Sequence, residues 1–327
     1  MSRRKKKTRN IVLIIIKFIF SLLFLLILFK KIDLNELLRI YISANLVYFI
    51  LAALISLLNV SIIGAYRWKI LLLKKSNMIE FKNLARLSII ARSLNTLIPG
   101  NFMGDIIRGL KFSKIGITKG FSMASVLMDR FIALVSFIFL SFFGFVLNFK
   151  ILHSSELLKY YVIVVALSII IMILLLRSNI FLFYSKKLKE ASLIFLNYVA
   201  VIFESLSLYK DKINIVLRSL LVSVISGLLT VSIFFLLGKA LSLSISFYFF
   251  ILVVPLITVV SMVPVTVGGL GIREYASVLL FSLTGISKIE ALSISLMFFV
   301  IMLIDSIIGL LFYFSMEYQI LHTHHQK

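Results

Sequence analysis

Long apolar runs separated by short polar segments make up most of this chain. Residues 11–29 form the first run, which is interrupted only by Lys17 and Ser21. At about 1.5 Å per residue, a helix of this length crosses a hydrocarbon core of about 30 Å. The pattern therefore predicts membrane-crossing helices at seven such runs: residues 11–29, 44–66, 131–147, 160–176, 217–237, 247–263 and 291–316.

Two further segments are apolar but irregular. Residues 84–98 are short for a crossing and carry Arg86 and Arg92, which predicts a re-entrant helix. Residues 264–284 are interrupted by three glycines and by Arg273-Glu274, which predicts a glycine-broken helix that still crosses the membrane. The expected fold class is an all-α polytopic membrane protein with about eight membrane-crossing segments, one or two of them broken or re-entrant. No internal repeat is expected.

Composition supports this interpretation and excludes several classes of function. Hydrophobic residues make up 61% of the 327 residues and charged residues only 15%, which is far from the usual balance of a water-soluble domain. The net charge is +22, but no segment has the composition of a basic soluble domain, so no nucleic-acid partner is expected. The chain has no cysteine, and its histidines are His153 and three at the tail, so neither a metal site nor a cofactor is expected.

The basic residues between the runs predict the orientation of the chain. Two alternating sets of connecting segments carry 22 and 7 lysines and arginines. By the positive-inside rule the richer set is cytoplasmic, and it includes the basic tail at residues 1–10. We therefore expect a single integral domain over residues 1–327 in the cell membrane, with a cytoplasmic amino terminus and a short cytoplasmic tail at residues 317–327.

The segment around residue 100 carries the first candidate site. Pro99 and Gly100 stop the preceding helix, because proline disfavours helix at the residue before it. Asp105 and Arg108 follow at a spacing of three, which places both on one face of the next helix. Polar and charged groups flanked by apolar runs in a membrane are usually functional, although an interfacial loop with a local ion pair would produce the same pattern.

The glycine-rich segment is the second candidate site. Its glycines allow the backbone to turn and expose amides, and a helix beginning near Ile272 would direct its positive end at that turn. An anionic head group would fit there, whereas close helix packing through small residues is the alternative. The residues of this site are Pro264, Gly268, Gly269, Gly271, Arg273 and Glu274.

Four other ionisable residues lie in or beside apolar runs. Asp305 is isolated in mid-span, where an unpaired carboxylate costs about 2.5–3.5 kcal/mol, so a cation or a proton should accompany it. Asp129 and Arg130 come just before a run and are either functional or an interface pair. Arg92 lies inside the re-entrant segment. Trp68, between two basic residues at a helix end, is expected to be an interface anchor.

The two motifs together resemble the membrane region of the lysylphosphatidylglycerol synthase/flippase family. The resemblance rests on Pro99-Gly100, Met103-Gly104-Asp105 and Arg108, and on Pro264, Gly268-Gly269-Leu270-Gly271 and Glu274. Met103 stands where family members often have a first glycine. In two-part members a soluble aminoacyl-transferase domain follows, and here the chain ends at Lys327. The resemblance therefore implies the lipid-translocating half and argues against synthase activity.

The function expected from these observations is that of a lipid flippase-like transporter for a phospholipid or a polyprenyl-phosphate lipid. Arg108 and Arg273 would contact the phosphate of an anionic phospholipid head group, while Asp105, Glu274 and Asp305 would hold them or contact a cationic amino group. A proton-coupled carrier of small solutes, with Asp305 as the proton site, is the first alternative. A membrane-embedded polyprenyl-phosphate glycosyltransferase is the second, but the short outside loops offer few acidic residues for a metal.

Overall fold

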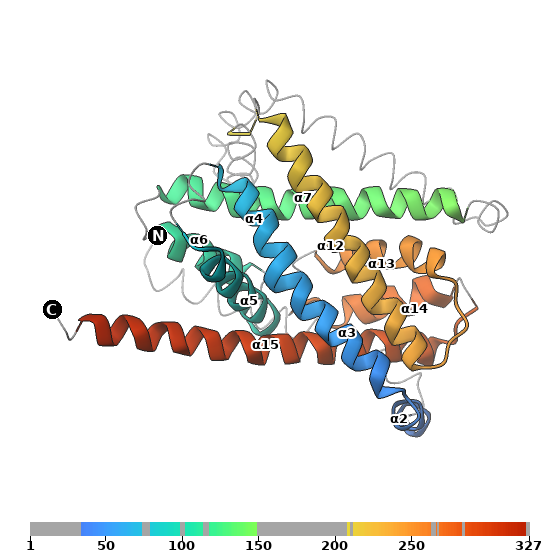
Figure 1. Ribbon diagram of the computed structural model, residues 1–327. Helices are drawn as coiled ribbons and strands as arrows, with labels where there is room; N and C mark the ends of the chain where they lie inside the picture. The colour runs from blue at the N-terminus through green and yellow to red at the C-terminus, as the bar shows by residue number, and fades with distance from the viewer. Residues whose placement is uncertain are drawn as a thin grey trace, which may run out of the picture.

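The computed structural model describes residues 34–73, 79–98, 102–113, 118–148, 208–209, 212–262, 266, 268–282 and 285–324, and all regular structure in these ranges is helical (Figure 1). Four helices are long and apolar enough to cross a membrane: Leu46–Leu71, Lys119–Leu147, Ile213–Ala240 and Lys288–Ser315. The predicted fold class, an all-α polytopic membrane protein, is thus confirmed. The elements are α2 (Leu34–Ile42), α3 (Leu46–Leu58), η1 (Asn59–Gly64), α4 (Ala65–Leu71), α5 (Phe81–Leu97), α6 (Met103–Ser113), α7 (Lys119–Leu147), α12 (Ile213–Ala240), α13 (Phe247–Ser261), α14 (Ile272–Ser282) and α15 (Lys288–His324).

The long helices differ from the apolar runs mainly in their ends. Helix α7 begins at Lys119, twelve residues before the run at 131–147, and therefore brings Asp129 and Arg130 into the helix. The span Leu46–Leu71 is continuous, but its middle turn is the π-helix η1. The expected helices at residues 11–29 and 160–176, and the tail at residues 1–10, lie outside the described residues.

Helices α5 and α6 form a hairpin in place of a single short re-entrant helix. Helix α5 has 17 residues and α6 has 11, and they pack against each other along their length. Leu84, near the start of α5, and Phe112, near the end of α6, lie in one apolar cluster with Trp68. The open ends of the hairpin therefore lie together, although the membrane side on which they open stays a prediction.

Helices α13 and α14 form a second hairpin. The run at 247–263 was expected to cross alone, but α13 has 15 residues and spans only about 22 Å. Helix α14 begins at Ile272, as the glycine-rich motif predicts. Gly268, Gly269 and Gly271 precede it with positive φ angles of 59°, 79° and 87°, a conformation that glycine adopts readily. The glycines thus build the turn that leads into α14.

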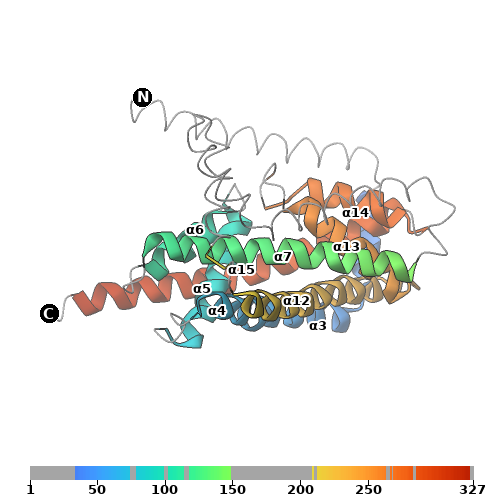
Figure 2. The same cartoon turned by 90° about the horizontal axis from the view of Figure 1, so that it is seen from above.

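The two hairpins belong to an inverted repeat. Each hairpin is followed by a long helix, α7 or α15, and Met103 and Ile272 are separated by the same number of residues as Lys119 and Lys288. Helix α7 begins beside α6 and ends beside α13, whereas α15 begins near α13 and α14 and ends beside α5, so the two long helices run in opposite directions (Figure 2).

Each hairpin packs against the long helix of the other half of the repeat. Helix α5 packs extensively on α15, and α13 packs extensively on α7. The hairpins meet near their tips, where a methyl group on Gly268 would lie 2.7 Å from the carbonyl oxygen of Thr96.

The orientation of this fold can be tested by cysteine labelling, because the chain has no native cysteine and each introduced one reports alone. We expect single cysteines at positions 5, 75, 114 and 187 to react only from the cytoplasm and those at 35, 154 and 287 only from outside. Membrane-impermeant maleimide on intact and permeabilised cells measures this. Labelling of position 114 from outside would show that the α5–α6 hairpin does not return to the side on which it begins.

Candidate functional site

A polar cavity of about 300 Å³ lies where the two hairpin tips and η1 meet. Residues of α3, η1, α4, α5, α6, α7, α12, α13, α14 and α15 line it. Seven charged side chains are among its lining residues: Arg67, Arg92, Asp105, Arg108, Asp129, Arg130 and Arg273. Such a concentration of charge between membrane-crossing helices makes this cavity the candidate functional site.

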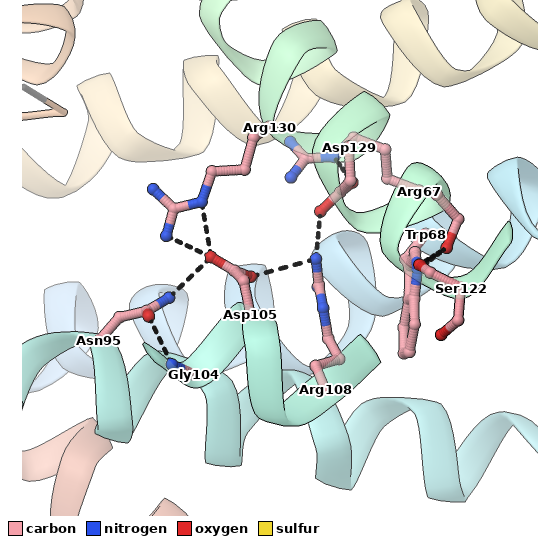
Figure 3. Close-up of polar contacts among 10 residues, drawn as sticks. Arg67, Trp68, Asn95, Gly104, Asp105, Arg108, Ser122, Asp129 and Arg130 are labelled. Carbon is pink, nitrogen blue, oxygen red and sulfur yellow. Dashed lines mark hydrogen bonds and ion pairs between the residues drawn. The ribbon is translucent and has the colours of Figure 1, made fainter. Parts of the chain in front are cut away.

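Asp105, in the first turn of α6, is the centre of one ion-pair network (Figure 3). Its carboxylate accepts hydrogen bonds from Arg130 Nε at 2.6 Å and from Asn95 Nδ2 at 3.0 Å. Arg108 Nη2 lies 3.3 Å from Asp105 Oδ1, which confirms the predicted pair at a spacing of three residues. Asn95 Oδ1 accepts from the amide of Gly104 at 2.8 Å, so the same side chain ties α5 to the start of α6.

Asp129 joins this network to the long span. It accepts from Arg67 Nε at 2.6 Å and from Arg108 Nη2 at 3.0 Å, so Arg108 bridges the two aspartates. Asp129 binds Arg67 and Arg108, whereas Arg130 binds Asp105. The two neighbours therefore belong to the network and do not form the interface pair that was the alternative. Arg67 was not among the predicted site residues, since its position near a helix end, between Tyr66 and Trp68, resembles a membrane interface.

Trp68 was expected to be an interface anchor, and this expectation is wrong. Its side chain is fully buried, and its Nε1 donates to Ser125 Oγ at 3.1 Å. The guanidinium of Arg108 lies 4.5 Å from its ring centre, a cation–π distance. Trp68 therefore forms one wall of the arginine network (Figure 3).

Arg273 and Glu274 form a separate buried pair at the start of α14. Two nitrogens of Arg273, Nη2 and Nε, lie 2.5 and 3.0 Å from Glu274 Oε1, and Ser295 Oγ donates to the same oxygen at 3.2 Å. Glu274 Oε2 accepts from the Gly271 amide at 2.5 Å and so caps the helix. The Gly271 amide is thereby already bound within the protein. Gly268 packs against Thr96, as the packing alternative predicts.

Asp305 and Arg92 have no ion-pair partner within the described ranges. Asp305 is 1% exposed, and its carboxylate accepts from Ser56 Oγ at 2.7 Å. Arg92 lines the cavity, and its buried Nε has no hydrogen-bond partner in the described structure. Five arginines and two aspartates line the cavity, and two further carboxylates outside the lining bind the lining residues Arg273 and Ser56. Together these nine charged groups carry one excess positive charge: Arg67, Arg92, Arg108, Arg130, Arg273, Asp105, Asp129, Glu274 and Asp305.

Three residues of the predicted motifs, Pro99, Gly100 and Pro264, lie outside the described residues. The others gather on the two hairpins and the long helices that hold them. Arg92, Asp105, Arg108, Asp129, Arg130, Gly268 and Arg273 all line the cavity, and Glu274 lies behind Arg273. Residues far apart in the sequence thus meet at one polar centre.

Comparison with known proteins identifies the architecture. A family model described as the lysylphosphatidylglycerol synthase TM region matches residues 14–309. The chain belongs to this family. Membership in the lysylphosphatidylglycerol synthase TM region family agrees with the motif resemblance and makes the chain a multi-pass membrane protein of a lipid-related family.

A curated relative extends the same result. A UPF0104 membrane protein of Methanocaldococcus jannaschii is 30% identical over 160 residues, which are 48% of this chain and 46% of the relative. The match thus spans about half the length of either protein. No solved structure matches this member of the lysylphosphatidylglycerol synthase TM region family.

Proposed function

We propose that this protein is a lipid flippase-like transporter that moves an anionic phospholipid or polyprenyl-phosphate lipid across the cell membrane. The observation that carries the proposal is Arg92, a cavity-lining cation without an ion-pair partner in the described structure. The carboxylate of Asp305 attracts Arg92 only from beyond ion-pair distance. A buried guanidinium without a direct partner is unfavourable, and an anionic ligand in the cavity supplies a direct contact. The polar cavity would receive the head group while the acyl or prenyl chains stay in the surrounding lipid.

The arginine network determines which side chains are available to a phosphate. Arg108 is held by both Asp105 and Asp129, and Arg273 is held by Glu274. Arg92 therefore replaces Arg108 and Arg273 as the main phosphate contact in our proposal. The paired arginines would not bind the phosphate directly. Their positive charges would still contribute to the net positive charge around the cavity.

We expect Arg92→Gln to reduce translocation of an anionic lipid at least tenfold, because a charge-assisted hydrogen bond contributes about 1.5–3 kcal/mol. Its melting temperature should change little, because Arg92 has no contact-distance ion pair in the described structure and attracts Asp305 only from farther away. The measurement is dithionite quenching of a fluorescent anionic lipid in proteoliposomes.

Arg86→Gln is the matched control, because Arg86 lies on the same helix outside the cavity, 5.9 Å from the Phe312 ring. It should translocate lipid at the wild-type rate. Wild-type activity in Arg92→Gln would remove the main support for a phosphate site. Failure of the wild-type protein to move any labelled lipid would favour the proton-coupled small-solute carrier, in which the buried Asp305 is the proton site.

A further inference from the structure

Two buried polar side chains in the cavity have no role in the ion-pair network. Asn59 is 8% exposed and Ser88 is 6% exposed, and both line the cavity. Asn59 Oδ1 and Ser88 Oγ have no hydrogen-bond partner in the described structure. Buried polar atoms are nearly always paired, so two such atoms beside Arg92, whose Nε also has no hydrogen-bond partner in the described structure, indicate a ligand site.

The orientation of the Asn59 amide is determined by its neighbours. Its Nδ2 donates to the backbone carbonyl of Ser226 at 3.0 Å and to Thr230 Oγ1 at 3.3 Å. Because a carbonyl oxygen only accepts, the nitrogen must face α12. The oxygen is therefore the atom left for the cavity, and it can pair only with a hydrogen-bond donor of the ligand.

The π-helix gives Asn59 its position. Asn59 is the first residue of η1, which interrupts the span Leu46–Leu71, and Val60 and Gly64 from the same element also line the cavity. A wide π turn inserts an extra residue into a helix and is frequent at functional sites. The span can thus continue across the membrane while this one turn presents a polar side chain.

Ser88 and Arg92 face η1 from α5. They are four residues apart on one helix and therefore share a face, and α5 packs against η1. A ligand between these elements meets a guanidinium and a hydroxyl on one side and an amide oxygen on the other. The guanidinium suits a phosphate, the hydroxyl can donate to a phosphate oxygen, and the amide oxygen requires a donor.

We infer that the ligand is a monoanionic phosphodiester whose head group carries hydroxyl groups, as glycerol and inositol do, and that Asn59 is the residue that recognises a hydroxyl. This inference rests on the proposed function. The single excess positive charge balances one negative charge, which fits a phosphodiester better than a phosphomonoester dianion. An ammonium group would also donate to Asn59, but the excess positive charge of the site disfavours it.

The test compares head groups of equal charge in proteoliposomes. Phosphatidylglycerol and phosphatidylinositol carry hydroxyls, whereas phosphatidylmethanol is a monoanionic phosphodiester without them. We expect the wild-type protein to translocate the first two about tenfold faster, because phosphatidylmethanol leaves the Asn59 oxygen unpaired. Phosphatidylethanolamine, which adds an ammonium, should move no faster than phosphatidylmethanol.

Substitutions at Asn59 should change this ratio without abolishing transport. In Asn59→Leu the rates for the three phosphodiesters should become equal, with phosphatidylmethanol moving at its wild-type rate. Asn59→Ser serves as a second variant. Its side chain is too short to reach the hydroxyl of the head group, and it changes the local packing in a different way from leucine, so it should also lose the preference. Thr230→Val is the control: it removes one amide partner but leaves the Ser226 carbonyl to orient Asn59, so the preference should persist.

The possible outcomes separate this inference from the function on which it rests. Equal wild-type rates for all phosphodiesters, or a preference that survives both Asn59 variants, would overturn the hydroxyl site while leaving lipid transport intact. Two results together would support both the transport function and the hydroxyl site: Arg92→Gln stops the movement of every lipid, and the Asn59 variants lose the preference for hydroxyl-bearing head groups. Release of entrapped glycerophosphoglycerol by the wild-type protein, with no movement of lipids, would overturn the inference and assign the site to a water-soluble phosphodiester.

Discussion

Gly104→Ala is expected to disrupt the α5–α6 hairpin and to lower the free energy of unfolding by about 3 kcal/mol or more. A methyl group on Gly104 would lie 1.9 Å from the carbonyl oxygen of Ala91 and 2.6 Å from its carbonyl carbon. Overpacking typically costs about 1–3 kcal/mol, and the upper end applies here because the obstacle is backbone, which cannot rotate away. Melting temperature in detergent and the yield of monodisperse protein measure the effect.

Gly120→Ala is the matched control for this prediction. Gly120 lies in α7, and a methyl group there would have no neighbour within 4 Å. Alanine is the better helix former, so this variant should be as stable as the wild type or up to about 1 kcal/mol more stable. Equal melting temperatures for the two variants would contradict the close approach of α5 and α6.

Glu274→Gln is expected to cost about 3–5 kcal/mol of stability, because it leaves the buried guanidinium of Arg273 without a counter-ion. Glu274 is 0% exposed and Arg273 is 3% exposed, so water compensates little for the lost charge. Glutamine can still accept from the Gly271 amide, and the loss therefore reports the charge pair rather than the helix cap. Chemical or thermal unfolding in detergent measures the change.

The double variant Arg273→Met/Glu274→Gln should recover most of this stability, because both charges are then removed together. Glu290→Gln is the control for the substitution itself. Glu290 accepts from the amide and hydroxyl of Ser287 at 2.9 and 2.8 Å in a cap that glutamine can also form, so the change should be small. A double variant no more stable than Glu274→Gln would argue against a coupled pair.

Local sequence spacing predicted the parts of the site that depend on neighbours within one helix. Asp105 and Arg108 pair as their spacing indicates, and α14 begins at Ile272 after its glycine turn. The pairing of Arg67 with Asp129 joins residues 62 positions apart. No local pattern distinguishes such an arginine from one that faces lipid head groups, so it was missed.

Hydrophobic run length also failed to separate a crossing helix from a buried hairpin arm. Residues 247–263 are apolar enough to cross, yet α13 is mostly buried between α7, α12 and α14. A helix surrounded by protein and a helix surrounded by lipid both require apolar side chains, so hydropathy alone cannot tell them apart. Helix α13 is shorter than the apolar run, and only the structure, with the glycine turn after the helix, shows where the helix ends.

The inverted repeat left a weak signal in the sequence. Thr118-Lys119 corresponds to Ser287-Lys288 at the starts of the long helices, and Leu127-Met128 corresponds to Leu296-Met297. Asp105 and Glu274 are both the third residue of a hairpin's second helix, and each binds a buried arginine, Arg108 and Arg273 respectively. The remaining positions have diverged because the two copies face different neighbours, and only the packing makes the correspondence evident.

The exchange of partners between the halves has a mechanical consequence. Helix α5 lies so close to α15 that a methyl group on Gly309 would touch Ser93 Oγ, and α13 lies equally close to α7 at Gly144. Each hairpin is therefore packed tightly against the long helix of the other half. In the transporter that we propose, rocking of these two units about the cavity would widen the path on one membrane face while narrowing it on the other, as in alternating access. Each half would then supply the gate for one side.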